Sequence, residues 1–284
     1  MGAIFGPAGN SLSYKKVSKS LSLKSYLGGY GLQAFEFQCG MGVKTSEEAA
    51  VKFKNSILDI QISIHAPYYI SLSSVDEFKR LRSVDYILQT ARLAKQMGAG
   101  RIIVHSGSCR NLDRTAALNL AKKTLRRAIN ELENEHLQEI VICPETMGKI
   151  NQLGNLEEVL ELCKIGENLI PCVDFGHLNA RTFGGIRTQF DYEKILNLIE
   201  NELGFNVLKK FHSHFSKVEY SENGGERRHL TFDDEVFGPC FEPLAELVVK
   251  RNLSPVFICE SAGTQAEDAA EMKSVYDGFK DLIK

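Results

Sequence analysis

The chain has 284 residues, of which 43% are hydrophobic and 25% are charged, and its formal net charge is −2 at pH 7. This composition is typical of a folded globular protein and excludes an extensively disordered chain. The nearly balanced charge argues against a protein that coats nucleic acid along its whole surface, although it permits a local basic face. No run reaches the roughly 20 apolar residues of a membrane helix, and no secretory leader precedes the first strand-like run, so we expect a cytoplasmic protein.

The seven cysteines are scattered and include no Cys-x-x-Cys pair. Cys143, Cys172 and Cys259 fall inside apolar strand-like runs, where a thiol behaves as a small buried hydrophobic group. The cysteines are therefore expected to be reduced residues of the core.

Short β-branched or aromatic runs alternate with longer segments of helical period, which is the pattern of βαβ units around a parallel sheet. The strand-like runs are Ala3–Phe5, Ala34–Phe37, Ile60–Ile64, Arg101–Val104, Glu139–Cys143, Leu169–Val173, Lys209–Ser213 and Pro255–Cys259. Helices are predicted at Ser74–Met97, Asn111–Glu133, Leu156–Ile165, Asp191–Leu203, Phe241–Arg251 and Ala266–Ile283. This order predicts an α/β fold, a single (β/α)₈ TIM barrel that comprises residues 1–284 as one domain.

Two segments need separate interpretation. In Ser74–Met97, the spacing of Phe78, Leu81, Val84, Leu88, Ala91 and Ala94 indicates one buried helix face. The polar stretch Lys217–Val236, which contains Gly224-Gly225, is too long for a simple strand-to-helix turn and is predicted to be a functional loop.

Side chains that can bind a metal stand where six consecutive predicted strands end. They are His65, His105, Glu145, Asp174, His214 and Glu260. Any one of them alone is more simply interpreted as a rim hydrogen-bond partner. Active sites of (β/α)₈ barrels lie at the C-terminal strand ends, so six in succession predict one shared site. Three carboxylates gathered there oppose one another's ionisation, and divalent cations remove that cost. Mixed histidine and carboxylate donors suit zinc, or less selectively manganese or iron.

Three further histidines have alternative interpretations. His177, three residues after Asp174, is either a metal ligand or part of a helix start. His229, in the predicted loop, is either a ligand or an exposed residue. His212 lies on the same strand face as His214 because side chains alternate with a period of two. His214 is preferred as the ligand because it is nearer the rim.

The ordered segments HAPY, HSGS, PET, VDFGH, HFSK, RRHL and CES resemble the endonuclease IV family of apurinic endonucleases across nearly the whole chain. The resemblance implies that His65, His105 and Glu145 hold one metal, that Glu145 bridges to a second held by Asp174, His214 and Glu260, and that His177 and His229 hold a third. It implies two or three Zn²⁺ per chain, with Mn²⁺ or Fe²⁺ as alternatives. The implied reaction, in base excision repair, cleaves damaged double-stranded DNA 5′ of an abasic site, with Glu145 orienting the attacking water in a monomeric enzyme.

The resemblance also assigns one substrate contact and shows departures. Tyr68 matches a family tyrosine that wedges at the lesion, and a packing residue at the rim is the alternative interpretation. Apart from the resemblance, Arg181, Lys217, Arg227 and Arg228 are candidate phosphate contacts, although solvated loop charges are the simpler interpretation. The family pairs the seventh-loop histidine with an aspartate two residues earlier. Here that position is Arg227, and the nearest acid is Glu226, three residues before His229. The basic, aromatic stretch that follows the second strand in the family is Gln38–Val43 here, and the chain has no Trp.

The alternative function is that of a single-metal sugar isomerase or epimerase of the xylose-isomerase-like barrels. Such an enzyme uses a Glu, Asp, His, Glu set, and Glu145, Asp174, His214 and Glu260 satisfy it. It has no evident need for four additional histidines at the rim. One metal per chain therefore favours the isomerase, and two or three favour the hydrolase.

Overall fold

The structure, a computed structural model, describes residues 2–109 and 112–283. It divides into two compact units, one formed by Met1–Phe35 with Val173–Lys284 and the other by Glu36–Cys172. The boundaries fall inside two strands, β2 (Ala34–Gln38) and β6 (Cys172–Asp174). The single domain expected for residues 1–284 stays a prediction.

The first unit contains a parallel sheet in the order β1, β10, β7, β6. The other strands of this sheet are β1 (Ile4–Pro7), β7 (His212–Phe215) and β10 (Val256–Cys259). Aromatic rings form much of its core, as in the stacked pair Phe5 and Phe257, whose centroids are 5.4 Å apart. The helices of this unit are α1 (Leu12–Val17), α2 (Leu23–Gly29), α7 (Phe175–Arg181), α8 (Gln189–Leu203), α9 (Phe205–Leu208), α10 (Glu242–Lys250) and α11 (Gln265–Ile283).

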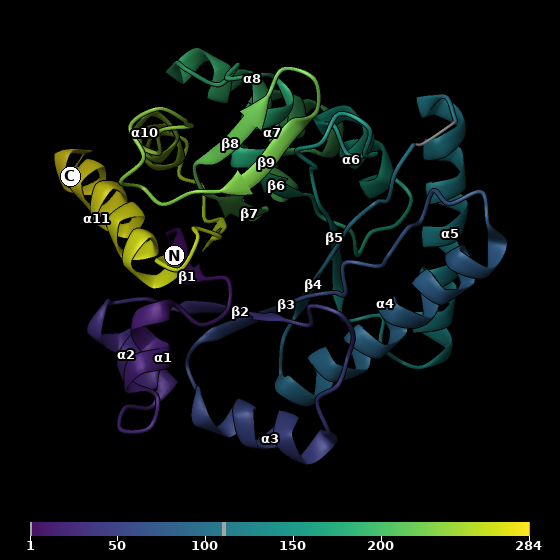
Figure 1. The fold of residues 1–284 in the computed structure, drawn as a ribbon, viewed down its shortest axis with the longest axis horizontal. Helices are drawn as coiled ribbons and strands as arrows, with labels where there is room; N and C mark the ends of the chain where they lie inside the picture. The colour runs from purple at the N-terminus through teal and green to yellow at the C-terminus, as the bar shows by residue number, and fades with distance from the viewer. Residues whose placement is uncertain (1, 110–111, 284) are drawn as a thin grey trace. The chain divides into compact units, whose positions relative to one another are not determined.

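An antiparallel hairpin of β8 (Val218–Ser221) and β9 (Gly225–His229) follows the sheet strand β7. Figure 1 shows this hairpin beside α7, and both of its strands contact that helix. The sequence predicted a loop over Lys217–Val236, and for the hairpin that prediction is wrong. The alternation in Val218-Glu219-Tyr220-Ser221 and the turn at Gly224-Gly225 allow the two strands to pair.

The second unit contains the sheet β2, β3, β4, β5, in which β3 (Gln61–His65), β4 (Arg101–Val104) and β5 (Val141–Pro144) pair in parallel. Its helices are α3 (Glu47–Ser56), α4 (Glu77–Met97), α5 (Arg114–Asn134) and α6 (Leu156–Cys163). Helix α4 begins at an Asp76 N-cap and ends at Gly98 in the left-handed region, with φ 73°. The predicted apolar face of α4 is buried from Val84 onward, but Phe78 is 83% exposed, so the prediction is wrong at its first turn.

All eight predicted strands are present in the described residues, with ends displaced by at most three positions, as at β7. The six predicted helices are present too, although the predicted start at Asn111 lies outside the described residues. Helices α1, α2, α3, α7 and α9 were not predicted. Four of them have at most seven residues, and α3, which has ten, buries only Ala50 and so shows no apolar face in the sequence.

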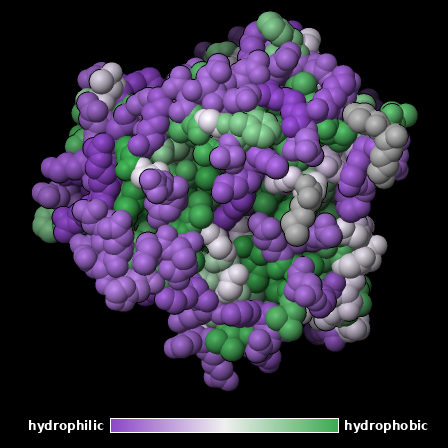
Figure 2. Space-filling view, turned by 180° about the vertical axis from the view of Figure 1, so that it is seen from behind, coloured by the Kyte–Doolittle hydropathy of each residue, from purple (hydrophilic) through white to green (hydrophobic). Residues whose placement is uncertain are grey.

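Within residues 2–109 and 112–283, no helix is both long and apolar enough to cross a membrane. The face drawn in Figure 2 carries many hydrophilic residues with smaller hydrophobic areas between them. This pattern agrees with the balanced composition of the chain.

Candidate metal centre

In the second unit, three neighbouring strands bring His65, His105 and Glu145 together. His65 is the last residue of β3, and His105 and Glu145 directly follow β4 and β5. Because these strands pair side by side and run parallel, their C-terminal ends meet. The Glu145 Oε2 atom lies 3.2 Å from His65 Nε2 and 3.1 Å from His105 Nε2. His65 and Glu145 are buried, and the His105 side chain is 18% exposed.

The hydrogen bonding of His65 fits a metal ligand. Its Nδ1 lies 2.8 Å from the carbonyl oxygen of Ala66, which can only accept, so Nδ1 donates. In the neutral imidazole Nε2 then carries a lone pair, and it faces the Glu145 carboxylate oxygen. Two electron-rich atoms at this distance repel unless a proton or a cation lies with them. A backbone bond that fixes the second ring nitrogen is what metal-binding histidines usually have.

In the first unit, Asp174, His214 and Glu260 form a second group. Asp174 ends β6, His214 lies in β7 and Glu260 follows β10, and these strands are neighbours in one sheet. Each offers one ligand atom within 4.8 Å of the others, and His214 Nδ1 lies 3.4 Å from Glu260 Oε2. Asp174 and His214 are fully buried, which makes an uncompensated negative charge costly there.

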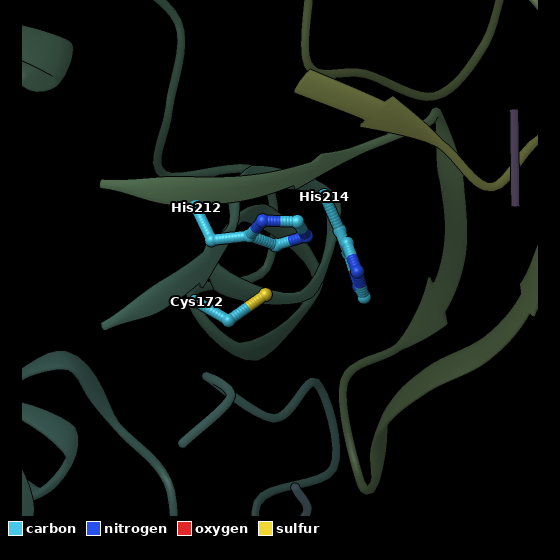
Figure 3. A group of neighbouring side chains, drawn as sticks. All are labelled: Cys172, His212 and His214. Atoms are coloured by element: carbon cyan, nitrogen blue, oxygen red, sulfur yellow. The ribbon is translucent and has the colours of Figure 1, made fainter. Parts of the chain in front are cut away.

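His212 lies on the same strand as His214, and Figure 3 shows the two imidazoles along β7. Both are fully buried, and their ring centroids are 5.5 Å apart. Of the two, His214 is the one within ion-pair distance of Glu260. This placement is consistent with the preference for His214 as the ligand.

Helix α7 positions His177 directly after the second group. Asp174 is the N-cap of this helix, and its Oδ1 accepts a 2.7 Å hydrogen bond from the His177 backbone N–H. The other oxygen, Oδ2, lies 3.2 Å from His177 Nδ1. One carboxylate therefore starts the helix and also orients the imidazole three residues later.

The hairpin supplies a third group, which consists of His177, Glu226 and His229 with ligand atoms within 4.8 Å of one another. The His177 Nε2 atom lies 3.5 Å from Glu226 Oε2, and the rings of His177 and His229 are 5.3 Å apart. His229 Nδ1 is hydrogen-bonded to Ser216 Oγ at 2.8 Å, which leaves its Nε2 for another partner. The side chains of His177 and Glu226 are only 5% and 14% exposed.

The predicted substrate residues occupy different settings. The Tyr68 ring is 54% exposed and lies 5.8 Å from the ring of His65. Arg181 is the last residue of α7. Lys217 Nζ donates to the backbone oxygens of Phe232, at 2.7 Å, and Asp234.

Both adjacent arginines of the hairpin contact the same acid. Arg228 Nε donates to Glu219 Oε2 at 2.6 Å, and Arg227 Nη1 lies 3.5 Å from Glu219 Oε1. These contacts hold the pKa of Glu219 below its ordinary value, with the Arg228 hydrogen bond as the largest cause. A phosphate that bound either arginine would compete with Glu219.

Sequence reasoning missed Glu36, a buried acid of the second unit. Glu36, in β2, is fully buried, and its carboxylate accepts hydrogen bonds from Ser63 Oγ at 2.9 Å and Gln38 Nε2 at 3.1 Å. The available signal was an acidic residue inside the apolar run Ala34-Phe35-Glu36-Phe37, because such a residue needs polar partners when buried.

Parallel strands that carry potential metal ligands at their C-terminal ends are typical of α/β proteins whose functional site lies at that end of the sheet. The chain belongs to the xylose isomerase-like TIM barrel family, whose profile matches residues 27–277, and the predicted TIM barrel fold is thereby confirmed. It is 33% identical over 270 residues to an uncharacterized protein of Methanocaldococcus jannaschii, covering 95% of this chain and 96% of the relative. It is 31% identical over 159 residues to a probable endonuclease 4 of Mycoplasma pneumoniae, covering 54% of this chain and 52% of that protein.

Two solved structures have a similar fold. A D-tagatose 3-epimerase-like protein aligns with a TM-score of 0.69 at 20% identity, covering 92% of this chain and 94% of its own. Endonuclease IV from Thermus thermophilus aligns with a TM-score of 0.62 at 18% identity, covering 92% of this chain and 96% of its own. At these identities the likeness concerns the fold, so the choice between the two activities depends on the site residues.

Proposed function

We propose that the chain is a metal-dependent phosphodiesterase that resembles endonuclease IV and cleaves double-stranded DNA 5′ of abasic sites in base excision repair. The observation that carries the proposal is the number of histidine and carboxylate groups, which exceeds what one metal uses. His65, His105, His177 and His229 stand outside the Asp174, His214 and Glu260 group, and each lies against a carboxylate or beside another of these histidines. The resemblance to endonuclease 4 proteins supports the same assignment.

The donor sets suit Zn²⁺, with Mn²⁺ or Fe²⁺ as alternatives, at two or three ions per chain. In this proposal His65, His105 and Glu145 would hold one ion, Asp174, His214 and Glu260 would hold a second, and His177 and His229 would take part in a third. Bound cations would make a water nucleophilic at neutral pH and offset negative charge on the phosphate.

The chain's own groups would then direct the reaction. Glu145, buried and held between two imidazoles, would orient the attacking hydroxide, which a water gives by losing a proton to solvent. The hydroxide oxygen bonds to phosphorus as the bond between phosphorus and the 3′ oxygen breaks. The departing 3′ oxygen takes a proton from solvent and becomes a 3′-hydroxyl, and the phosphate stays on the 5′ side of the abasic sugar.

Contacts to the duplex would come from exposed residues around the metal groups. The half-exposed ring of Tyr68, beside His65, could fill the gap left by a missing base. Arg181 and Arg228 are candidate phosphate contacts, and Arg228 would have to exchange Glu219 for the phosphate. Lys217 already holds two backbone oxygens, so its proposed role includes fixing the segment after the hairpin. We expect a cytoplasmic monomer.

The test combines a metal count with a cleavage assay. Purified protein should contain two or three transition-metal ions per chain by mass spectrometry of the elements. It should nick a 5′-labelled duplex that carries one reduced abasic site, and leave a matched intact duplex uncut. An intact abasic duplex, incubated with protein whose metal content is verified, would refute the proposal.

A single-metal sugar epimerase is the second candidate. The specific observation in its favour is that Asp174, His214 and Glu260 already form a compact group in a fold close to that of an epimerase-like protein. One ion per chain, together with conversion of a ketose into its epimer, would support it.

A further inference from the structure

The hairpin next to α7 contains an irregularity at the position where the sequence departs from the endonuclease IV pattern. Val218 pairs with His229 and Glu219 with Arg228, but Tyr220 then pairs with Glu226, so Arg227 has no partner position. This is a β-bulge, in which two residues of one strand oppose one residue of the other. The extra residue changes which side chains share a face.

The pairing assigns the faces directly, because residues opposite each other in an antiparallel pair project to the same side. Val218 and Tyr220 are two apart and share a face, so their partners His229 and Glu226 share it as well. In a regular strand, two residues three apart would project to opposite sides. The bulge therefore brings a carboxylate and an imidazole with an odd spacing onto one face.

This shared face is the one that packs on α7. A side-chain atom of Val218 lies 2.7 Å from where a Cβ would stand on Gly176, and Gly176 precedes His177 in that helix. The opposite face carries Glu219, to which Arg227 and Arg228 both turn, and these arginine side chains are 62% and 72% exposed. The arginine at the family's aspartate position thus faces away from the histidines.

We infer that Glu226, brought into line with His229 by the bulge at Arg227, is the carboxylate ligand of a metal site completed by His177. Two imidazoles with one carboxylate are a known zinc set, which leaves a further coordination position open. The inference rests on the proposed function for the existence of a metal at this end of the barrel. It adds the identity of the ligand and the backbone irregularity that positions it.

The contacts of the two histidines agree with this assignment. His177 Nδ1 lies 3.2 Å from Asp174 Oδ2, and its Nε2 lies 3.5 Å from Glu226 Oε2. His229 Nδ1 is occupied by Ser216 Oγ. In each ring one nitrogen thus lies beside an oxygen of the protein; His177 Nε2 faces the Glu226 carboxylate, and the Ser216 bond leaves His229 Nε2 for another partner. An oxygen beside the second ring nitrogen is the usual outer support of a metal ligand.

The first experiment measures zinc per chain after equilibration with buffered Zn²⁺, in the wild type and in Glu226→Gln. The variant keeps the shape of the side chain, and it should lose about one ion or bind that ion more than about 100-fold more weakly. Glu222→Gln, in the exposed turn of the same hairpin, is the matched control and should keep the wild-type count. An unchanged count in Glu226→Gln would overturn the assignment.

A second experiment tests the bulge. The double variant Arg227→Asp with Glu226→Gln moves the acid to the position of the family's aspartate. In this chain that position lies on the hairpin face that points away from His177 and His229, so the zinc count should stay low. Deletion of Arg227 should remove the bulge, leave Glu226 two residues from His229, and preserve the count. Recovery of the ion in the double variant would overturn the inference, and so would its loss in a deletion variant that keeps the wild-type circular dichroism spectrum. If the deletion variant does not fold, the double variant decides.

These readouts separate the ligand assignment from the proposed reaction. Loss of one zinc in Glu226→Gln from a protein that does not nick abasic DNA would support the site and reject the phosphodiesterase. A nicking enzyme whose zinc count is insensitive to Glu226→Gln would keep the function and reject the site.

Discussion

Gly176 offers a sharp test of how closely the hairpin and α7 must approach. It lies between Asp174 and His177 in the first turn of α7, and a Cβ added there would meet the Ser216 carbonyl oxygen at 2.5 Å and a Val218 methyl at 2.7 Å. The carbonyl belongs to backbone and cannot rotate away. Gly176→Ala therefore has to push α7 and the hairpin apart.

The size of the displacement follows from the contact. Ordinary van der Waals separation begins near 3.4 Å, so the 2.5 Å approach has to open by roughly 0.9 Å. Ligand distances in metal sites tolerate only about 0.2 Å. The added methyl group should cost about 1–3 kcal/mol of unfolding free energy, as overpacked sites do, and should weaken binding at the His177 and His229 position.

Thermal unfolding and zinc titration calorimetry together measure both effects. Gly176→Ala should lower the melting temperature by several degrees, because a chain of this size loses about 2–4 °C per kcal/mol. The matched control is Gly278→Ala in α11, where a Cβ would meet nothing within 4 Å. That variant should be neutral or about 0.5–1 kcal/mol more stable, since alanine favours helix. A Gly176→Ala protein with wild-type melting temperature and zinc content would refute the reasoning.

Three further predictions concern other sites. As a test of the proposed reaction, Glu145→Gln should keep the fold yet bind metal and cleave abasic DNA at least about 100-fold less well, as measured by a zinc count and a single-turnover nicking assay. Hydrogen bonds from Thr188 lower the Asp191 pKa from 3.8 to about 2, so Asp191 contributes stability that is present above pH 4 and lost as pH falls towards 2. Asp191→Asn should accordingly destabilise the protein to urea at pH 7, and the difference should vanish near pH 2. Among the seven cysteines, all of which lie in the described part of the chain, only Cys240 is exposed, so one thiol should react promptly with a coloured disulfide reagent. Cys259, whose pKa burial raises to about 12, should react only after unfolding.

The sequence was most informative where chemistry and position coincide. Strands such as Arg101–Val104 were predictable because β-branched residues form a short buried run, and the donor residues directly follow such runs. Because active sites of (β/α)₈ barrels lie at the C-terminal strand ends, the sequence places His105 and Glu145 at neighbouring strand ends. In the structure His105 Nε2 lies 3.1 Å from Glu145 Oε2.

The features that escaped prediction depend on tertiary context. The hairpin was not predicted because its outward-facing residues Glu219, Arg227 and Arg228 make the segment as polar as a loop. Helix α7 begins directly at Asp174, so no loop composition announces it. Phe78 fits the apolar period of α4 but lies beyond the packed surface, since a pattern shows which residues share a face and not how far the neighbouring layer extends.

One oxygen of Asp174 accepts a hydrogen bond from the His177 backbone N–H, and the other lies 3.2 Å from Nδ1 of the His177 imidazole. Asp174 therefore belongs both to the start of α7 and to the group of candidate metal ligands. Fraying of that first turn would release the carboxylate and the ring together, and occupation of the donors would in turn protect the amide of residue 177 against hydrogen exchange. The hydrogen-exchange rate of this one backbone amide should therefore report how much of the protein has bound metal, and the measurement needs no substrate.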